Sequence, residues 1–451
     1  MAPTVRSFSA AFEPLHLVER HPGRYPGFLE SASDPLVKLA DRFDILPIAG
    51  GEVLQLTAQS LSGPYSESGH FLKALDDWWR SLRTPRAGAS SQEIPFDGGW
   101  LLYLGYELAA EIEPVLKLPS GPQPYIALAI RTPAAWIRDR SNGAEYLIAE
   151  PGAEGLLDQF ETDARESGGF AAPSGRLKIE EEDPSLFLAA VERALEYTAA
   201  GDVYQTNLSR QWYARAASAI NPVDLYRRLR RANPSPFAAL LRYRDVSILS
   251  SSPERLLALR GGRAATRPIA GTRPRGATPT EDGALVNALL ANEKERAEHV
   301  MLIDLERNDL GRVCEAGSVA VDEYMSIESY AHVHHIVSNV SGTLRADTTP
   351  VDAIRAVFPG GTITGCPKVR CMQIIAELEG GGRGAYTGSI GYLSRSGDCD
   401  LNILIRTIAV HGAELRFRTG AGIVADSVPD QELAETRAKA LGLLRALDAA
   451  S

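Results

Sequence analysis

The segment ELRFRTGAGIVADSVPDQELAETRAKA, residues 414–440, reads as a strand followed by a helix. Its first half is β-like up to Ala425, and Pro429 is typical of the first turn of a helix. In that helix Glu432, Glu435 and Lys439 are spaced i, i+3 and i+7. All three side chains therefore project from one helical face.

A second pair of acids, Glu295 and Glu298, repeats the i, i+3 spacing far upstream. If the two helical faces meet, Glu295, Glu298, Glu432 and Glu435 form an oxygen-only cage, which is the ligand set that Mg2+ prefers. The alternative is that each pair lies on a solvated helix face. The sequence predicts a magnesium site on the condition that the two helices converge.

Composition indicates a globular protein with a large core. The chain has 451 residues, of which 44% are hydrophobic, enough for one large domain or for two to three smaller ones. Its net charge of -10 argues against nucleic-acid binding, and the Arg-rich segment 226–233 is interpreted as an exposed helix face.

Localisation is expected to be cytoplasmic. The N-terminal segment lacks the apolar core of a signal peptide, and no stretch approaches the roughly 18 apolar residues of a membrane span. The four cysteines are too sparse for a disulfide framework and are expected to be reduced thiols. Neither secretion nor insertion into a membrane is expected.

The order of elements predicts an α+β fold with mostly antiparallel sheets. Helical patterns such as residues 184–200 alternate with β-like segments such as 247–260, and several strand candidates follow one another without an intervening helix. A Gly-, Ser- and Pro-rich stretch ends near residue 173. We therefore expect an N-terminal region over 1–165 and a second region over 180–447.

Two apparent motifs are rejected. Gly420, Gly422 and Ala425 match the outline of a dinucleotide-binding turn, but Pro429 starts the helix too late for its N-terminus to face a pyrophosphate. The histidine cluster places His332 and His334 on one strand face and His335 on the other, which makes three-histidine zinc coordination awkward. His335 as a single catalytic group and His335 as a structural residue both stay open.

The segments resemble, in order, the chorismate-utilising enzymes, which include component I of anthranilate synthase, component I of aminodeoxychorismate synthase, isochorismate synthase and salicylate synthase. The matching stretches are GDVYQTNLS (201–209), SSPERLL (251–257), RPIAGTRPRG (267–276), ERAEHVMLIDLERNDLGRV (295–313), HVHHIVS (332–338), FPGGTITGCPKVR (358–370), YTGSIGYLS (386–394), NILIRT (402–407) and GAGIVADSVPDQELAETRAKA (420–440). The resemblance implies the fold of anthranilate synthase component I, with antiparallel sheets in a sandwich core and helices packed outside.

The resemblance also implies where chorismate binds. Glu298 and Glu435 would ligate Mg2+ and Glu295 and Glu432 would hold its waters, so that the metal anchors the ring carboxylate. The other implied substrate-binding residues are Arg406 and Tyr386 for the enolpyruvyl carboxylate, Gly420, Ala421 and Gly422 for a backbone anion nest, and Lys439 for the ring carboxylate.

The implied catalytic residues are Glu254, His335 and Thr272. Glu254 would be the general acid for departure of the C4 hydroxyl, because hydroxide leaves poorly without a proton. Thr362 would line the ring beside His335. A catalytically inactive ligand sensor is the alternative from another class, although it would not need the general acid and the four metal carboxylates together.

Two positions bear on the nucleophile. The water-using members of the family carry a lysine base where this chain has Gln205, and glutamine takes no proton at neutral pH, so ammonia is the expected nucleophile. Many aminodeoxychorismate synthases carry a ring-attacking lysine where this chain has Ala270, which resembles anthranilate synthase. Against this, the segments 42–46, 333–338, 358–365 and 388–392 resemble the aminodeoxychorismate branch. We therefore expect amination at C4, with amination at C2 as the alternative.

The resemblance implies two further ligands. No cysteine lies in the setting of a glutaminase nucleophile, so ammonia is expected from a separate glutamine amidotransferase subunit. The stretch FLES (28–31) resembles the tryptophan-binding stretch of anthranilate synthase. Whether these residues bind tryptophan or form a strand packed in a β core stays open.

Overall fold

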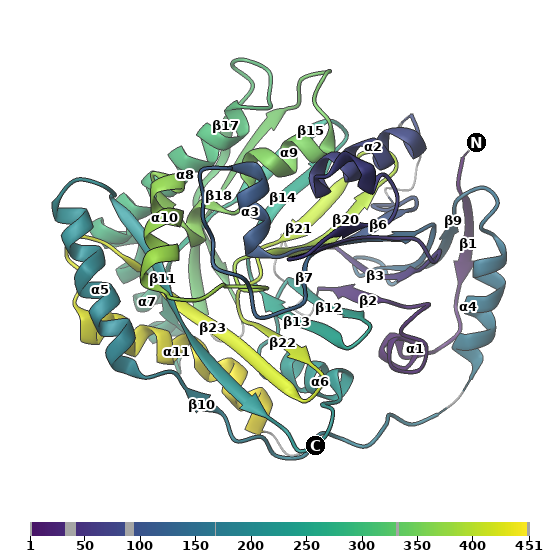
Figure 1. The fold of residues 1–451 in the computed structure, drawn as a ribbon, viewed down its shortest axis with the longest axis horizontal. Coiled ribbons are helices and arrows are strands. Elements are labelled where there is room, and N and C mark those ends of the chain that lie inside the picture. Colours follow the sequence, from purple (N-terminus) through teal and green to yellow (C-terminus); the bar gives the residue numbers. More distant parts are fainter. Residues whose placement is uncertain (1, 32–41, 86–93, 167, 331–332, 449–451) are drawn as a thin grey trace.

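Two large antiparallel sheets form the molecule (Figure 1). The computed structural model describes residues 2–31, 42–85, 94–166, 168–330 and 333–448. Every strand pair within these ranges is antiparallel. The α+β class predicted from the order of elements is confirmed.

The first sheet, called sheet A, runs from the N-terminal strand to the strands beside the C-terminal helix. Its order is β1 (Thr4–Phe8), β9 (Glu145–Ala149), β8 (Ala134–Asp139), β3 (Phe43–Ile48), β2 (Gly27–Glu30), β12 (Phe237–Tyr243), β13 (Val246–Ser252), β22 (Thr407–His411), β23 (Glu414–Ile423), β11 (Gln205–Arg215) and β10 (Glu180–Glu181), with β19 (Gly365–Cys366) also paired to β11.

The second sheet, called sheet B, has the order β16 (Ile269–Pro274), β18 (Val333–Thr343), β15 (Arg263–Arg267), β14 (Arg255–Arg260), β21 (Cys399–Asn402), β20 (Ser389–Ser394), β6 (Gly99–Leu104), β7 (Tyr125–Thr132), β4 (Val53–Thr57) and β5 (Leu61–Ser62), with β17 (Ala320–Ser329) paired to β18. Both sheets contain strands from the regions 1–165 and 180–447: β2 pairs with β12, and β6 pairs with β20. The two regions therefore share both sheets, and the expected boundary does not separate one sheet from the other.

Apolar side chains fill the space between the sheets. Leu101 and Leu128 of sheet B form one buried cluster with Leu241 and Ile248 of sheet A. Such two-sided burial is what makes a sandwich core. The predicted sandwich is confirmed.

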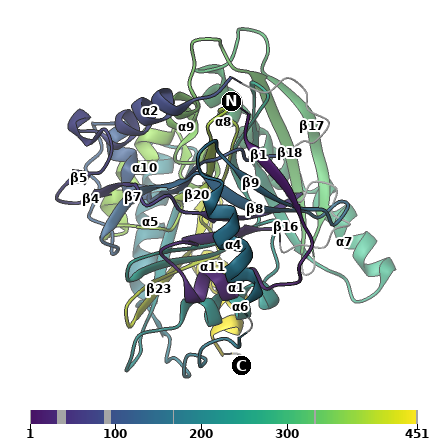
Figure 2. The same ribbon diagram turned by 90° about the vertical axis from the view of Figure 1, so that its right-hand side faces the viewer.

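Helices cover the outer faces (Figure 2). A buried cluster joins sheet A to α1 (Pro14–Arg20), α4 (Gly155–Arg165), α6 (Pro222–Ala232) and α11 (Pro429–Asp448). A second cluster joins sheet B to α2 (Phe71–Leu82), α8 (Glu293–Gly311) and α9 (Pro350–Val357). In the described ranges no helix combines the length and the apolar composition that crossing a membrane requires.

The helices that carry the predicted acids begin as the sequence indicates. Helix α8 starts after Asn292, whose side chain accepts a hydrogen bond from the backbone N–H of Glu295 at 3.0 Å. Helix α11 starts at Pro429 directly after the loop that follows β23. An N-cap and an N-terminal proline fix these starts. As a result, each pair of acids lies in or near the first turns of its helix.

Two of the connections between the sheets lie side by side. One leads from β13 to β14 through Glu254, and the other leads from β21 to β22 through Arg406. The backbone N–H of Ile403 donates to the carbonyl of Glu254 at 3.0 Å, and that of Ser251 donates to the carbonyl of Arg406 at 3.1 Å. These bonds hold two charged side chains at the seam of the sandwich.

Candidate active site

The predicted site residues lie where one end of sheet A meets one end of sheet B. Strands β11 and β23 form one wall together with α11, and strands β16 and β18 form the other together with α8. A hydrogen bond of 2.9 Å from Nε2 of Gln205 on β11 to Oε1 of Glu298 on α8 joins the two walls. Residues 93 positions apart along the chain are therefore neighbours.

Glu254 is a buried carboxyl group suited to proton donation. Its side chain is 5% exposed, and burial raises its pKa from 4.5 to about 7. The hydroxyl of Thr362, in the short helix Gly361–Ile363, donates to Oε1 at 2.7 Å, and the backbone N–H of Ile269 also hydrogen-bonds to the carboxyl group. A carboxyl group with a pKa near 7 can act as a general acid at neutral pH.

His335 is neutral and has one unpaired nitrogen. Its Nδ1 lies 2.9 Å from Oγ1 of Thr272 and 3.4 Å from the carbonyl of Gly271, which can only accept and so favours a proton on Nδ1. Burial, reinforced by the nearby positive charge of Arg406, lowers the pKa of His335 to about 3. Its Nε2 is buried without a partner among the described residues, and His332 lies outside them. Nε2 is therefore available to accept a hydrogen bond from a ligand.

Arg406 is a partly buried cation whose side chain forms no hydrogen bond or ion pair with the other described residues. Burial lowers its pKa, and its backbone has a left-handed φ of 51°. A partly buried guanidinium without a carboxylate partner in the chain is suited to pair with an anionic ligand. This geometry fits the predicted carboxylate-binding role of Arg406.

Three of the four predicted metal carboxylates each have a partner within the chain. Glu298 accepts from Gln205, Glu295 accepts from Arg273 at 2.9 Å, and Glu435 lies 2.7 Å from Nζ of Lys439. Burial raises the pKa of Glu298, and the negative charges of Glu295 and Glu435 raise it further. The carboxylates are thus near enough to repel one another, and an oxygen-only set with excess negative charge fits a hard divalent cation.

The acids do not form a closed cage in this structure. Among the described residues, no three His, Cys, Asp or Glu side chains approach closely enough to share a metal ion. Glu432 lies one helical turn before Glu435 on α11 and has an interaction of its own. The convergence of the two helices agrees with the prediction, and the magnesium ligands stay a prediction.

Gly420, Ala421 and Gly422 lie in the extended strand β23, paired with β11, and their part in binding an anion stays a prediction. The two glycines also provide space for neighbouring side chains. A Cβ on Gly422 would lie 2.3 Å from Nε2 of Gln205, and one on Gly420 would lie 2.7 Å from the hydroxyl of Tyr386. Nζ of Lys439 donates to the Gly420 carbonyl at 2.9 Å. A larger residue at either glycine would displace the side chain of Gln205 or Tyr386.

Ala270 lies on β16 opposite Ile336 of β18 and is 6% exposed. Gly271, with φ of 72°, forms an irregularity between Ala270 and Thr272 that turns the strand beside the carboxylate of Glu295. Because the Ala270 methyl group has no nucleophilic atom, this wall of the site offers no covalent attachment at that position.

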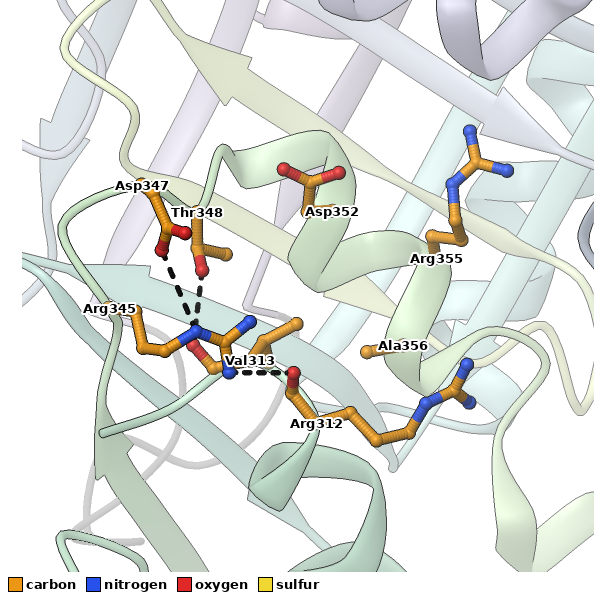
Figure 3. Close-up of a pocket in the computed structure, with 8 residues that line it drawn as sticks. All are labelled: Arg312, Val313, Arg345, Asp347, Thr348, Asp352, Arg355 and Ala356. Carbon is orange, nitrogen blue, oxygen red and sulfur yellow. Dashed lines mark hydrogen bonds and ion pairs between the residues drawn. The ribbon is translucent and has the colours of Figure 1, made fainter. Parts of the chain in front are cut away.

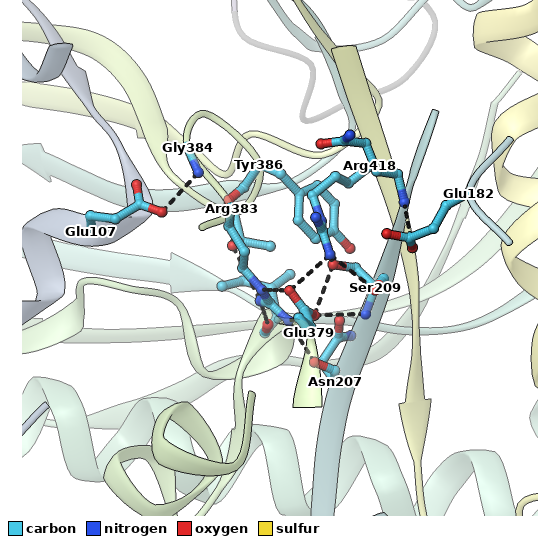
Figure 4. Close-up of polar contacts among 12 residues, drawn as sticks. Glu107, Glu182, Asn207, Ser209, Glu379, Arg383, Gly384, Tyr386 and Arg418 are labelled. Carbon is cyan, nitrogen blue, oxygen red and sulfur yellow. Dashed lines mark hydrogen bonds and ion pairs between the residues drawn. The ribbon is translucent and has the colours of Figure 1, made fainter. Parts of the chain in front are cut away.

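A buried ionic cluster that sequence reasoning missed supports the site from one side (Figure 4). Arg383 donates to Glu379 at 2.6 Å, to the Asn207 carbonyl at 2.7 Å and to the Ile363 carbonyl at 3.1 Å, and its guanidinium packs 5.4 Å from the ring centre of Tyr386. Arg383 therefore connects the strand of Gln205, the short helix of Thr362 and the loop of Tyr386.

Two further contacts complete this cluster. Arg418 lies 3.1 Å from Glu379, and the Ser209 hydroxyl donates to the same carboxylate at 2.8 Å. The sequence signal for the cluster is the i, i+4 spacing of Glu379 and Arg383, a common pattern that by itself indicates a surface pair. Only the tertiary structure shows that both side chains are buried.

A separate surface pocket of about 340 Å³ contains none of the predicted residues (Figure 3). Three arginines line it, but Arg345 donates to the Arg312 carbonyl at 2.8 Å and lies 3.6 Å from Asp347. Asp352 is occupied by the capping interactions of Thr349 at the start of α9. These contacts assign the Arg345 and Asp352 side chains to the structure of the pocket.

Residues 28–30 of the stretch 28–31 lie in β2 of sheet A, next to β12. Glu30 is buried, accepts from the Tyr226 hydroxyl at 3.0 Å and pairs with Arg230 at 3.2 Å. The cavity beside it measures about 30 Å³, which is the size of a water molecule rather than an indole ring. The packed-strand alternative describes this conformation, and tryptophan binding stays a prediction.

Comparison with known proteins agrees with this geometry. The family described as chorismate binding enzyme matches residues 44–445. Aminodeoxychorismate synthase component 1 of Bacillus subtilis is 41% identical over 98% of this chain and 95% of its own length. Anthranilate synthase component 1 of Aquifex aeolicus is 42% identical over 79% of this chain and 75% of its own length. The crystal structure of anthranilate synthase component I from Streptococcus pneumoniae has a TM-score of 0.79 at 30% identity, over 97% of this chain and 99% of that one.

Proposed function

This chain belongs to the family of chorismate-binding enzymes, and we propose that it aminates chorismate at C4 with ammonia, forming 4-amino-4-deoxychorismate for 4-aminobenzoate and folate synthesis. The observation that carries the proposal is the pair at the seam of the sandwich. Arg406 is a partly buried cation whose side chain has no ion pair in the described structure, and Glu254 beside it is protonated below about pH 7. One binds a carboxylate, and the other supplies a proton to a leaving group.

Each residue contributes a defined part of the reaction. The ammonia lone pair forms the bond to C4 as the C4–O bond breaks, and the carboxyl group of Glu254 donates its proton so that hydroxide leaves as water. The new amine releases one proton. Thr362 holds Oε1 of Glu254, and Nε2 of His335 accepts a hydrogen bond from the ring substituents. Because Ala270 has no nucleophile, no enzyme–ring bond is formed at that position.

The carboxylates suit Mg2+ as the cofactor. Glu298 and Glu435 would hold the ion, with Glu295 and Glu432 reaching it through water. When bound, Mg2+ supplies positive charge that anchors the ring carboxylate and offsets the repulsion among the acids. Lys439, which lies between Glu435 and the Gly420 carbonyl, adds a second positive charge on the same side.

Amination at C2 with release of pyruvate, as in tryptophan synthesis, is the second candidate. The observation that favours it is Ala270, which lacks the lysine found in many enzymes that aminate at C4. The relatives do not separate the two, since an aminodeoxychorismate synthase at 41% identity and an anthranilate synthase at 42% are equally similar.

Product identification tests the proposal. Purified protein is incubated with chorismate, Mg2+ and ammonium, and the products are separated by liquid chromatography with mass detection. The expected product is 4-amino-4-deoxychorismate, which retains its enolpyruvyl group. Anthranilate together with pyruvate would assign the chain to C2 amination, and no conversion in the presence of Mg2+ would favour the ligand-sensor alternative.

In cells, we propose that the protein acts in the cytoplasm and receives ammonia from a glutamine amidotransferase subunit. The chain's four cysteines support this partner, since all four have other settings: Cys314, Cys371 and Cys399 are buried thiols, and Cys366 lies in β19. Adding the matched glutaminase with glutamine is expected to replace ammonium as the source of ammonia.

Tryptophan binding at β2 is tested separately by calorimetry, and the Glu30→Gln variant serves as the comparison.

A further inference from the structure

We propose that Glu107, in the N-terminal region, is a positioning residue for Tyr386. This inference rests on the proposed function, in which the Tyr386 hydroxyl meets a carboxylate of chorismate. Glu107 lies in the short helix Tyr106–Leu108, directly after β6. Tyr386 lies in residues 382–388, which lead into β20 and are called the Tyr386 loop.

The backbone of the Tyr386 loop is unfavourable on its own. Gly384 and Thr387 have left-handed φ angles of 60° and 63°, and for a β-branched residue such as threonine this conformation is strained. Residues in such conformations persist where the surrounding structure fixes them. The contacts that fix this loop therefore decide where the Tyr386 side chain points.

Three hydrogen bonds join the loop to the N-terminal region. The backbone N–H of Gly384 donates to Oε1 of Glu107 at 3.0 Å (Figure 4), and the Gly384 carbonyl accepts from the backbone N–H of Tyr106 at 2.8 Å. The backbone N–H of Ala385 donates to Oε1 of Gln123 at 3.2 Å. The two residues directly before the tyrosine are therefore held from the N-terminal side.

The carboxyl group of Glu107 is enclosed together with the loop. Glu107 is buried and forms no ion pair within the described ranges, and burial raises its pKa. The N–H group of Gly384 compensates part of that cost by donating to the carboxyl group. A Cβ on Gly121 would lie 2.8 Å from Oε2 of Glu107 and 3.2 Å from Cα of Gly384. The packing leaves no room for the carboxyl group and the loop to move apart.

Arg383 connects the same short helix to the tyrosine ring. Its guanidinium lies 4.9 Å from the ring centre of Tyr106 and 5.4 Å from that of Tyr386. The Tyr386 side chain is 7% exposed, and its hydroxyl makes no hydrogen bond with another described residue. A tyrosine hydroxyl in a buried setting usually has a partner. This hydroxyl is therefore available to a ligand at a position that Glu107 and Tyr106 set.

Kinetic constants of two variants at position 107 test the role. Leucine removes the acceptor, so Glu107→Leu is expected to raise the KM for chorismate about tenfold, the effect of one lost hydrogen bond to the substrate. The value of kcat should change less than about threefold, because Tyr386 contributes to binding rather than to proton transfer. Glutamine keeps an oxygen for the Gly384 N–H, and Glu107→Gln should stay within about threefold of the wild-type KM.

Glu111→Leu is the matched control. Glu111 lies in the next short helix, α3 (Ala109–Ile112), and its carboxylate accepts from the backbone N–H groups of Phe71 and Leu72 at 2.8 and 2.7 Å. It makes the same kind of hydrogen bond at the start of α2, away from the Tyr386 loop. Glu111→Leu should lower the free energy of unfolding, as Glu107→Leu does, but leave the KM for chorismate unchanged.

A double-mutant cycle with Tyr386→Phe separates positioning from folding. If Glu107 acts through the tyrosine hydroxyl, Glu107→Leu should raise the KM less than about threefold once that hydroxyl is absent. A full tenfold rise in both backgrounds, or an unchanged KM in the wild-type background, would overturn the proposal. If Glu107→Leu does not fold by circular dichroism, Gln123→Leu, which removes the acceptor for Ala385, is measured in both backgrounds with the same expected result.

The same cycle is also measured as the Kd for chorismate by calorimetry in the presence of Mg2+. Failure of the proposed function would appear in the wild-type protein as the absence of 4-amino-4-deoxychorismate, whereas failure of this inference leaves wild-type amination intact. Because the Kd does not depend on turnover, the cycle decides the role of Glu107 in either case.

Discussion

The hydroxyl of Thr362 donates a hydrogen bond of 2.7 Å to Glu254, across the junction where the chain leaves sheet A for sheet B. This bond stabilises the ionised carboxylate and so lowers the pKa of Glu254, against the larger effect of burial, which raises it to about 7. The pair therefore sets the pH range in which Glu254 holds its proton.

Amination should decline as pH rises through about 7, because Glu254 loses its proton there. In Thr362→Val the ionised form loses its hydrogen bond, so the pKa rises and the decline moves to higher pH. The measurement is kcat/KM for chorismate against pH, with ammonia expressed as the free base at each pH. A Thr362→Val profile that is unchanged or moved to lower pH would contradict the role of this bond.

Glu254→Gln should stabilise the fold while it lowers the rate. In the folded chain the pKa is about 7 and in the unfolded chain about 4.5, so the unfolded state loses its proton first as pH rises. The contribution of the protonated Glu254 to the free energy of unfolding is complete below about pH 4.5 and is lost by about pH 7. The free energy of unfolding changes by up to about 3 kcal/mol over this range. Urea unfolding at pH 8 should show Glu254→Gln more stable than wild type, and at pH 4 the two should agree.

The same variant should lose about 10²–10⁴-fold in kcat, the usual contribution of a general acid. Glu377→Gln, an exposed glutamate on the helix Lys368–Leu378, is the control and should keep wild-type kcat. A Glu254→Gln enzyme with wild-type kcat would exclude Glu254 as the proton donor.

Arg406→Gln should weaken chorismate binding, because a buried carboxylate would lose its charged partner. Truncating one member of a buried charge pair typically costs roughly 2–5 kcal/mol of binding free energy, which corresponds to at least about 30-fold in affinity. Equilibrium binding in the presence of Mg2+ measures this change. Arg355→Gln, in the surface pocket, is the control, and equal affinities for the two variants would remove Arg406 from the substrate site.

Glu298→Gln and Glu435→Gln should both raise the Mg2+ concentration needed for half-maximal rate, by about tenfold or more, because each removes a charged oxygen ligand. Titration of apo-protein with Mg2+ by calorimetry gives a readout that does not depend on turnover. Glu414→Gln, on β23 away from the acids, should bind Mg2+ like wild type. Unaltered Mg2+ affinity in Glu435→Gln would remove it from the metal site.

Arg383→Met should lower the free energy of unfolding by about 3–5 kcal/mol, because it leaves the buried carboxylate of Glu379 without its principal cation. Adding Glu379→Leu should recover part of that loss, since the uncompensated charge is then gone. Chemical denaturation of the single and double variants measures the coupling. Strictly additive effects would show that the two side chains do not act as a unit.

The sequence by itself determined the antiparallel α+β sandwich, the helices α8 and α11, and the residue types of the site. Local patterns sufficed for these: Pro429 begins a helix, Glu432 and Glu435 share its face, and ordered segments resemble a known family. Gly420 to Gly422 lie in β23, as the β-like pattern up to Ala425 predicted, and pair with β11 in an extended conformation; their part in binding an anion stays a prediction.

Only the tertiary structure decided which side chains meet. The burial that raises the pKa of Glu254, the isolation of Arg406 and the enclosure of Arg383 depend on two sheets closing over connections that are about 150 residues apart along the chain. Periodicity reports which face of an element is apolar, but it carries no information about the distance between elements. Desolvation and charge pairing are set by that distance, and so the chemistry of the site appears only in the folded chain.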